Sequence, residues 1–195
     1  MKKNTRELLI DSAFQEFYRH GYQGANIATI LKEVGINKGS MYHFFKSKKE
    51  LALAVIKEII AKHILTKYEN ILKNDNVIEV LFNTLASAPD TLIYGCPLNK
   101  MSQEMVYLDE DFKKVLSVVY KEFEKSIENI LVKGIKNSEI EPCEEKQTAR
   151  LIIATFEGAL MIYHLNRNKE QYNQIIKTLK ISLFNNLYVK AYPLH

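Results

Sequence analysis

Apolar residues recur at helical spacing along most of the chain, and short polar or glycine-containing segments separate the runs. In the first run the apolar positions lie three or four apart, as on one face of a helix: Leu9, Ile10, Ala13, Phe14 and Phe17. Asn4 and Glu7 have the spacing of a capping box, so a helix is expected to begin there, and Gly21 is expected to end it. The chain therefore opens with an amphipathic helix.

Two short helices joined by a glycine turn are predicted next. Asn26 can cap the earlier of the two, Gly35 makes the turn, and Asn37 can cap the later one. The later helix carries polar residues on one side and has an apolar, inward side made of Met41, Phe44 and Phe45. This is the arrangement of a helix-turn-helix, whose second helix enters the major groove of DNA.

The rest of the chain predicts further helices and no strand of any weight. Ser47 and Glu50 form another capping box, at the start of a fourth helix that is expected to reach about Ile71. Helices are also expected over about 77–88, 97–107, 110–134, 144–166 and 170–189, with 87–97 as the loosest segment. We therefore predict an all-α fold of about nine helices, with a three-helix domain over residues 1–48 and a larger helical domain over residues 49–195.

Positive charge is concentrated at the N-terminal end. The chain has 27 Lys and Arg against 23 Asp and Glu, which gives a net charge of +4. The first fifty residues hold nine basic and five acidic residues, whereas the remainder holds eighteen of each. A polyanionic partner at this end is expected, with a solvated basic surface as the alternative.

The remaining composition is that of an ordinary soluble protein. Only two cysteines are present, Cys96 and Cys143, which are too few for a disulfide framework. The longest apolar stretch, residues 151–165, is interrupted by Glu157 and is short for a membrane span. Nothing at the N-terminus resembles a signal peptide, so a cytoplasmic protein without a membrane partner is expected.

Residues 4–51 resemble the DNA-binding domain of the tetracycline-repressor (TetR) family. The resemblance rests on the glycine spacing at 35 and 39, the Tyr-His-Phe-Phe-Lys block at 42–46 and the Ser-Lys-Lys-Glu sequence at 47–50. It implies a homodimeric transcription factor, usually a repressor that a small ligand releases from its palindromic operator. It also implies an all-helical body in which helices eight and nine form the dimer interface. Further along, residues 95–98 (Gly-Cys-Pro-Leu) and Glu104 are similar to the start of helix six in one branch of the family.

DNA contacts are expected from the two short helices and from the start of the fourth. Lysines there can neutralise phosphates, polar side chains and helix-start amides can bind phosphate oxygens, and a glycine lets the backbone approach a base edge. The candidates are Asn26, Thr29, Asn37, Lys38, Gly39, Ser40, Tyr42, His43, Lys46 and Lys48. Base reading is expected mainly from Lys38 and Thr29, because Ala28 stands where the family often has a long polar residue. Such a small set leaves room for readout of DNA shape, and Tyr42 could instead be a core aromatic residue.

An effector pocket and a dimer seam are expected in the body. The pocket candidates are aromatic, sulfur-containing and polar residues, many of which could equally be core: Tyr94, Cys96, Met101, Met105, Tyr120, Phe123, Phe156, Glu157, Leu160 and His164. Glu157 could instead pair with Arg150 or a lysine, and Cys96 could be a redox sensor or a small buried hydrophobe. The dimer candidates rest mainly on the resemblance: Ala159, Ile162, Leu179, Leu183 and Leu187, with Gly158 allowing close approach.

Other functions are less favoured by the sequence. An enzyme, or a protein that binds metal or haem, is disfavoured because metal-ligand spacings, glycine-rich phosphate loops and nucleophile elbows are missing. No cofactor and no metal are therefore expected. An activator or a recruiting scaffold with the same DNA-binding head stays open, and a membrane-surface role for the basic head is a weaker alternative.

Overall fold

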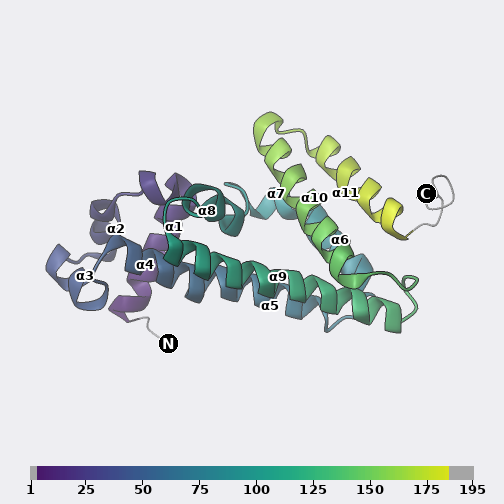
Figure 1. Ribbon diagram of the computed structural model, residues 1–195. Helices are drawn as coiled ribbons and strands as arrows, with labels where there is room; N and C mark the ends of the chain where they lie inside the picture. The colour runs from purple at the N-terminus through teal and green to yellow at the C-terminus, as the bar shows by residue number, and fades with distance from the viewer. Residues whose placement is uncertain (1–3, 185–195) are drawn as a thin grey trace. The chain divides into compact units, whose positions relative to one another are not determined.

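The computed structural model describes residues 4–184, which form helices and the turns between them (Figure 1). No strand occurs in this range, and the predicted all-α fold is confirmed. The described residues up to Ile64 form one compact unit together with Pro97–Lys121, called unit 1 below. Leu65–Cys96 and the described residues from Glu122 onward form unit 2. The predicted domain boundary after residue 48 is a division by function, and it stays a prediction.

Unit 1 begins with four helices that start at the predicted capping residues. The helices are α1 (Thr5–Gly24), α2 (Ile27–Val34), α3 (Lys38–Phe44) and α4 (Lys48–Val55). The first backbone N–H groups of a helix have no partner within it, and here a side chain accepts a hydrogen bond from one of them in each helix. These side chains belong to Asn4, Asn26, Asn37 and Ser47.

Two glycines adopt backbone angles that other residues rarely adopt. Gly35, with φ 75° and ψ 33°, ends α2 and makes the predicted turn. The sequence predicts that Gly21 ends the first helix, but α1 resumes after it and continues to Gly24. Gly21, with φ 74° and ψ 173°, is therefore a kink within α1 and not its end.

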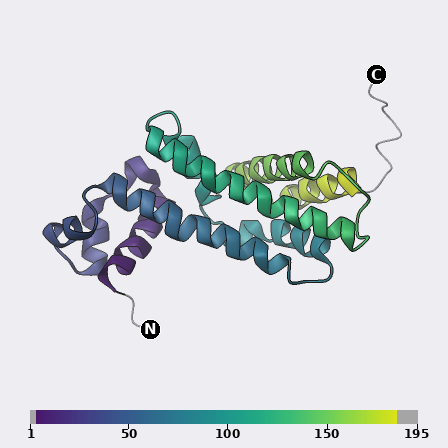
Figure 2. The ribbon, with the colours of Figure 1, turned by 60° about the horizontal axis from the view of Figure 1, so that its bottom comes forward.

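The predicted fourth helix is present and contains a π-helical turn. α4 continues into η1 (Ile56–Ile60) and α5 (Ala61–Ile71), and the three segments form one continuous helix in Figures 1 and 2. A π turn changes which residues of a helix face the core. Here Ile56 and Ile60 are buried, while the carboxylate of Glu58 accepts two hydrogen bonds, at 2.8 and 2.5 Å, from the guanidinium of Arg6.

The remaining helices agree with the predicted segments, and the end of the last one, expected at about residue 189, lies outside the described residues. Unit 1 also contains α8 (Pro97–Met105) and the beginning of α9 (Glu110–Lys136). Unit 2 contains the rest of α9 and three further long helices, which are α6 (Val77–Ala86), α10 (Glu145–Asn166) and α11 (Lys169–Phe184). α10 and α11 lie side by side (Figures 1 and 2). With α4, η1 and α5 taken as one helix, the described range holds the nine predicted helices and a four-residue helix, α7 (Ala88–Thr91), in the segment expected to be loosest.

Each unit has its own apolar core, and burying one large side chain contributes about 1.5–3 kcal/mol. The core of unit 1 includes Leu9, Phe17, Ile30, Met41 and Leu51. The core of unit 2 includes Leu81, Leu85, Ile127, Leu131, Ile152, Phe156 and Tyr172. These residues fix the helices on which the functional side chains lie.

Two buried tyrosines are part of the core of unit 2. The hydroxyl of Tyr172 donates a hydrogen bond to the backbone carbonyl of Leu85 at 2.6 Å, and the ring of Tyr68 lies 5.0 Å from that of Phe123. Burial raises the pKa of both hydroxyls well above the ordinary tyrosine value, and the negative charge of Glu157 raises both further. Both hydroxyls are therefore expected to stay protonated at pH values where tyrosines of an unfolded chain ionise.

We expect the free energy of unfolding to fall as the pH rises above about 10, because tyrosines ionise there in the unfolded chain and not in the folded one. Tyr172→Phe should reduce this slope by up to about 1.4 kcal/mol per pH unit. At neutral pH the same variant should lose about 1 kcal/mol of stability with its hydrogen bond. Urea unfolding at about pH 7 and about pH 10.5 measures both effects. If the free energy of unfolding depends on pH in the same way in Tyr172→Phe and the wild type, Tyr172 ionises in the folded protein as it does in the unfolded one.

Candidate nucleic-acid interface

α3 has one buried side and one exposed side. Met41 and Phe45 are 1% and 2% exposed and anchor the helix in unit 1. The opposite side carries exposed residues that were predicted to contact DNA, which are Lys38, Gly39, Tyr42 and His43. Because Tyr42 is 47% exposed, the alternative that it is a core aromatic residue is wrong. A helix fixed on one side and polar on the other can enter a groove of duplex DNA.

Local contacts orient the polar side chains of α3. The ammonium of Lys38 lies 5.8 Å from the ring centroid of Tyr42, one helical turn later, which is a cation–π contact. The side-chain oxygen of Asn37 accepts hydrogen bonds from the backbone N–H of Ser40 at 2.9 Å and from its hydroxyl at 3.2 Å. Asn37 therefore holds the start of α3, and only its amide nitrogen is left to donate to a phosphate.

The start of α2 is held in a similar way. The side-chain oxygen of Asn26 accepts a hydrogen bond from Ala28 N–H at 2.8 Å, and its own backbone N–H donates to Glu16 at 2.9 Å. Asn26 and Thr29 are both exposed, as a contact with DNA requires.

The three lysines at the start of α4 have different surroundings. Lys46 is exposed, and its backbone N–H donates to the carboxylate of Glu50 at 2.7 Å. The ammonium of Lys48 donates to the carbonyl oxygens of Ala25 at 2.6 Å and Gln23 at 3.4 Å. Burial lowers the pKa of Lys48. Lys46 is therefore placed for a phosphate, whereas Lys48 already has partners within unit 1.

Lys49 lies between two carboxylates at the start of α9. Its ammonium is 2.7 Å from both Asp109 and Asp111, and hydrogen bonds to these groups raise its pKa. Two lysines at a helix N-terminus are unfavourable with the helix dipole, so anionic partners are expected from sequence. For Lys49 these partners are aspartates of the protein.

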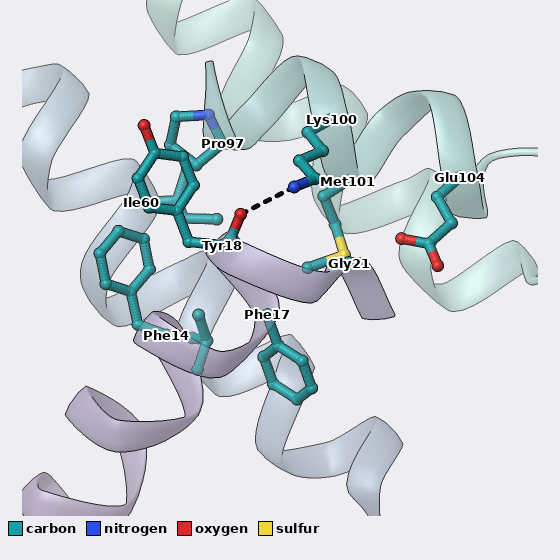
Figure 3. Close-up of a pocket in the computed structure, with 10 residues that line it drawn as sticks. Phe14, Phe17, Tyr18, Gly21, Ile60, Pro97, Lys100, Met101 and Glu104 are labelled. Atoms are coloured by element: carbon teal, nitrogen blue, oxygen red, sulfur yellow. Dashed lines mark hydrogen bonds between the residues drawn. The ribbon is translucent and has the colours of Figure 1, made fainter. Parts of the chain in front are cut away.

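The pocket candidates are divided between the two units. Met101 and Met105 are buried in unit 1, where Tyr120 is 41% exposed. The other candidates belong to unit 2: Tyr94, Cys96, Phe123, Phe156, Glu157, Leu160 and His164. A cavity in unit 1 borders Met101, but its volume is about 10 Å³, enough for one water molecule at most (Figure 3).

In unit 2, the loop before α8 lies against α10. A side chain at Gly95 would come within 3.7 Å of the ring of His164, so Gly95 and His164 are neighbours. Phe123, Phe156 and Leu160 are buried, and Glu157 and Cys96 are half-buried. The structure adds two residues that sequence reasoning missed, the half-buried Lys67 and the buried Tyr68, because Cys96 acts electrostatically on both and Glu157 on Tyr68. That these residues bind an effector stays a prediction.

The dimer candidates differ in their exposure. Ala159 and Leu179 are 2% and 7% exposed and pack inside unit 2, Ile162 and Leu183 are half-buried, and Leu187 lies outside the described residues. Sequence reasoning named Gly158 but missed four exposed apolar residues that lie on the same side of α10 at helical spacing. Together with the half-buried Gly158 they form a stripe, called the α10 stripe below, which consists of Leu151, Ala154, Gly158, Met161 and Leu165.

Neither a metal site nor a membrane span emerges from residues 4–184. No group of three or more His, Cys, Asp or Glu there could hold a metal ion. No helix in that range is long and apolar enough to cross a membrane.

These features define the class of the protein as a helix-turn-helix DNA-binding protein. Residues 9–55 match the family described as bacterial regulatory proteins, tetR family, and residues 76–179 match the tetracyclin repressor-like C-terminal domain. The chain belongs to the TetR family and is a DNA-binding transcriptional regulator. This family consists of regulators and not of enzymes, which confirms the expectation that the chain is not an enzyme.

Similar proteins span nearly the whole chain. An uncharacterized HTH-type transcriptional regulator in the lacX 3′ region of Lactococcus lactis subsp. lactis is 32% identical, over 92% of this chain and 93% of the relative. The transcriptional repressor DhaR of Mycobacterium sp. strain GP1 is 25% identical over 88% of each chain. The repressor NemR of Escherichia coli K12 is 25% identical, over 91% of this chain and 92% of NemR. The crystal structure of reduced E. coli NemR has a TM-score of 0.80 and 22% identity, over 93% of this chain and 97% of that one.

The surroundings of the lysines predict different salt dependences. Lys38→Ala should weaken DNA binding and flatten the plot of log affinity against log salt by about 0.9 for each phosphate that the variant no longer neutralises. Lys49→Ala should leave that slope unchanged, because two aspartates hold its ammonium. Fluorescence anisotropy over a salt series, with a duplex selected by the wild-type protein from a random library, measures both slopes. Equal slopes for Lys38→Ala and the wild type would exclude Lys38 as a phosphate ligand.

Proposed function

We propose that the protein is a repressor that binds a palindromic operator as a homodimer and leaves it when a small molecule binds the body. The observation that carries this proposal is that α3 is buried on one side and exposed on the other, where it presents Lys38, Gly39 and Tyr42. The relatives DhaR and NemR are named as repressors, which supports this direction of control. A regulator of bacterial genes must reach the chromosome, which lies in the cytoplasm of the cell, so we propose a cytoplasmic location.

In this proposal, residues 1–48 contact DNA and residues 49–195 bind the effector and the second subunit. Lys38 and Thr29 read bases, Lys38 also neutralises a phosphate, and Asn26, Ser40 and Lys46 bind the backbone. A head of this size makes few contacts, so a second copy is needed for affinity. Two heads related by a two-fold axis bind half-sites about 34–36 Å apart, or a multiple of that distance.

The effector part of the proposal rests on the mixture of side chains in unit 2. Apolar groups such as Phe123 and Leu160 can bury the body of a small molecule, and half-buried polar groups such as Glu157 and Lys67 can orient it. A ligand acts only if it favours one arrangement of the heads over another. A thermal-shift screen of small molecules, followed by DNA-release assays of the hits, tests this part.

A reporter assay separates repression from the alternative of an activator or recruiting scaffold with the same head. A reporter gene is placed behind a promoter that contains the selected duplex, in cells with and without the protein. We expect lower output with the protein present and recovery when an effector is added. Output that falls when the protein is removed would identify an activator instead.

The α10 stripe supports the proposed dimer. Leu165, Met161 and Leu151 are 79%, 52% and 50% exposed, and no atom lies within 4 Å of a side chain built at Gly158. Apolar side chains that recur on one face of a helix are suited to pack against a second helix, and a glycine among them permits close approach. A two-fold axis would place one α10 stripe against the other.

Leu165→Glu should therefore convert the dimer to a monomer, because like charges that face each other across an interface cost several kcal/mol. We expect the dimer dissociation constant to rise by roughly a hundredfold or more, measured by analytical ultracentrifugation. Leu108→Glu is the matched control, since Leu108 is 63% exposed and lies in unit 1. A dimer unaffected by Leu165→Glu would place the interface elsewhere.

A further inference from the structure

Two side chains of α8 bind backbone groups of α1 on either side of the kink at Gly21. Beyond the kink, the carboxylate of Glu104 accepts hydrogen bonds from the N–H groups of Tyr22 at 2.7 Å and Gln23 at 2.6 Å. Before the kink, the ammonium of Lys100 donates to the carbonyl oxygens of Tyr18 at 2.8 Å and Arg19 at 3.3 Å. Figure 3 shows Lys100 directed toward the Tyr18 carbonyl, with Glu104 further along α8.

The charges of these two side chains match the polarity of the break. Free carbonyl oxygens at the end of a helical segment carry partial negative charge, and free N–H groups at the start of the next carry partial positive charge. The ammonium lies at the carbonyls and the carboxylate at the N–H groups. Hydrogen bonds in which one partner is charged are roughly twice as strong as neutral ones, so α8 holds the kink firmly.

Gly21 is required by this arrangement. Its φ of 74° is a conformation that other residues rarely adopt, and a side chain there would come within 2.7 Å of a carboxylate oxygen of Glu104. The glycine and the carboxylate therefore depend on each other.

The segment that Glu104 holds also holds the DNA-binding elements. The carbonyl oxygens of Gln23 and Ala25 accept the hydrogen bonds from Lys48, at the start of α4. The ring of Tyr22 lies 4.9 Å below the same ammonium and 4.9 Å from the ring of Phe112. Asn26, which follows Ala25 in the chain, is the cap of α2. Residues 22–26, called the strap below, thus connect Glu104 with the starts of both α2 and α4.

We propose that Glu104 and Lys100 are positioning residues for DNA binding: they fix the strap, and through it they set Asn26 and the start of α4 at the DNA-facing side of unit 1. Neither residue touches DNA in this role. A displacement of α8 relative to α1 would break all four hydrogen bonds and release the strap. The inference rests on the proposed operator binding, and the two can fail separately.

The main test is Glu104→Gln, which replaces one acceptor oxygen with an NH₂ group that faces a backbone N–H. We expect operator affinity to fall by about tenfold, the loss typical of one hydrogen bond to a charged group. The matched control is Glu110→Gln, because Glu110 is exposed and has an ion pair with exposed Lys113, at 3.3 Å. Lys100→Met, which keeps the aliphatic stem, should also reduce the affinity. It is the substitute test if Glu104→Gln does not fold.

The measurement uses the full-length dimer and the duplex selected by the wild-type protein from a random library, at a temperature where circular dichroism shows each variant folded. A double variant of Glu104→Gln and Lys48→Met distinguishes positioning from stability. If Glu104 acts through the strap, the two reductions in affinity do not multiply, because each disturbs the same element. Faster amide exchange at residues 22 and 23 in Glu104→Gln should accompany the weaker binding.

The inference is overturned if folded Glu104→Gln binds the duplex as the wild type does, or if the reductions caused by the two substitutions multiply. A fall in melting temperature without a fall in affinity would also overturn it, since Glu104 would then be structural only. Failure of the wild-type protein to bind any duplex in a salt-sensitive way would instead contradict the proposed function.

Discussion

The hydrogen-bonding requirement of helix ends governs the architecture of unit 1. α2 and α3 have only eight and seven residues, so a large share of their backbone N–H and C=O groups lies at helix ends and needs other partners. Asn4, Asn26, Asn37 and Ser47 meet this need locally, within the first turn of each helix. At the kink of α1 no nearby side chain does so, and the partners come from α8 and α4. At the kink, charged side chains that bind backbone groups therefore connect elements that are distant in sequence.

This use of charge changes how the basic N-terminal region is interpreted. Sequence alone shows an excess of positive charge there, which a polyanionic partner explains. The structure shows that part of it is neutralised within unit 1, since Lys49 contacts two aspartates and Arg6 contacts Glu58. Lys38 and Lys46 stay exposed on the elements that were predicted to contact DNA. The electrostatic attraction to DNA therefore comes from fewer groups than the composition indicates, and shape readout becomes more important.

Local features of the fold could be predicted from sequence, and features that depend on distant residues could not. The four capping residues and the turn at Gly35 act within a few positions, so their spacing was sufficient. No local sequence pattern marks the π turn in the fourth helix, because it depends on how this helix packs against residues that are distant in sequence. The pairing of Glu104 with Tyr22 joins residues 82 positions apart, and the aspartates beside Lys49 are also distant in sequence. Apolar periodicity marked α10 as a helix but did not tell which apolar side faces the core, so Ala159 was assigned to the dimer seam although it is buried.

That second apolar side of α10 is difficult to explain for an isolated chain. A helix with one partner face needs one apolar side, and α10 already has one in Ile152, Phe156 and Leu160, which are 2% exposed or less. The α10 stripe lies on other positions and exposes several large apolar side chains to water. Burying such area against a second copy would contribute about 25 cal/mol for each Å² removed from water, before the cost of association. Two copies of one helix can cover each other completely only around a two-fold axis, and such an axis also presents two equivalent heads to a palindromic sequence. The proposed dimer and the proposed reading of a symmetric operator thus call for the same symmetry.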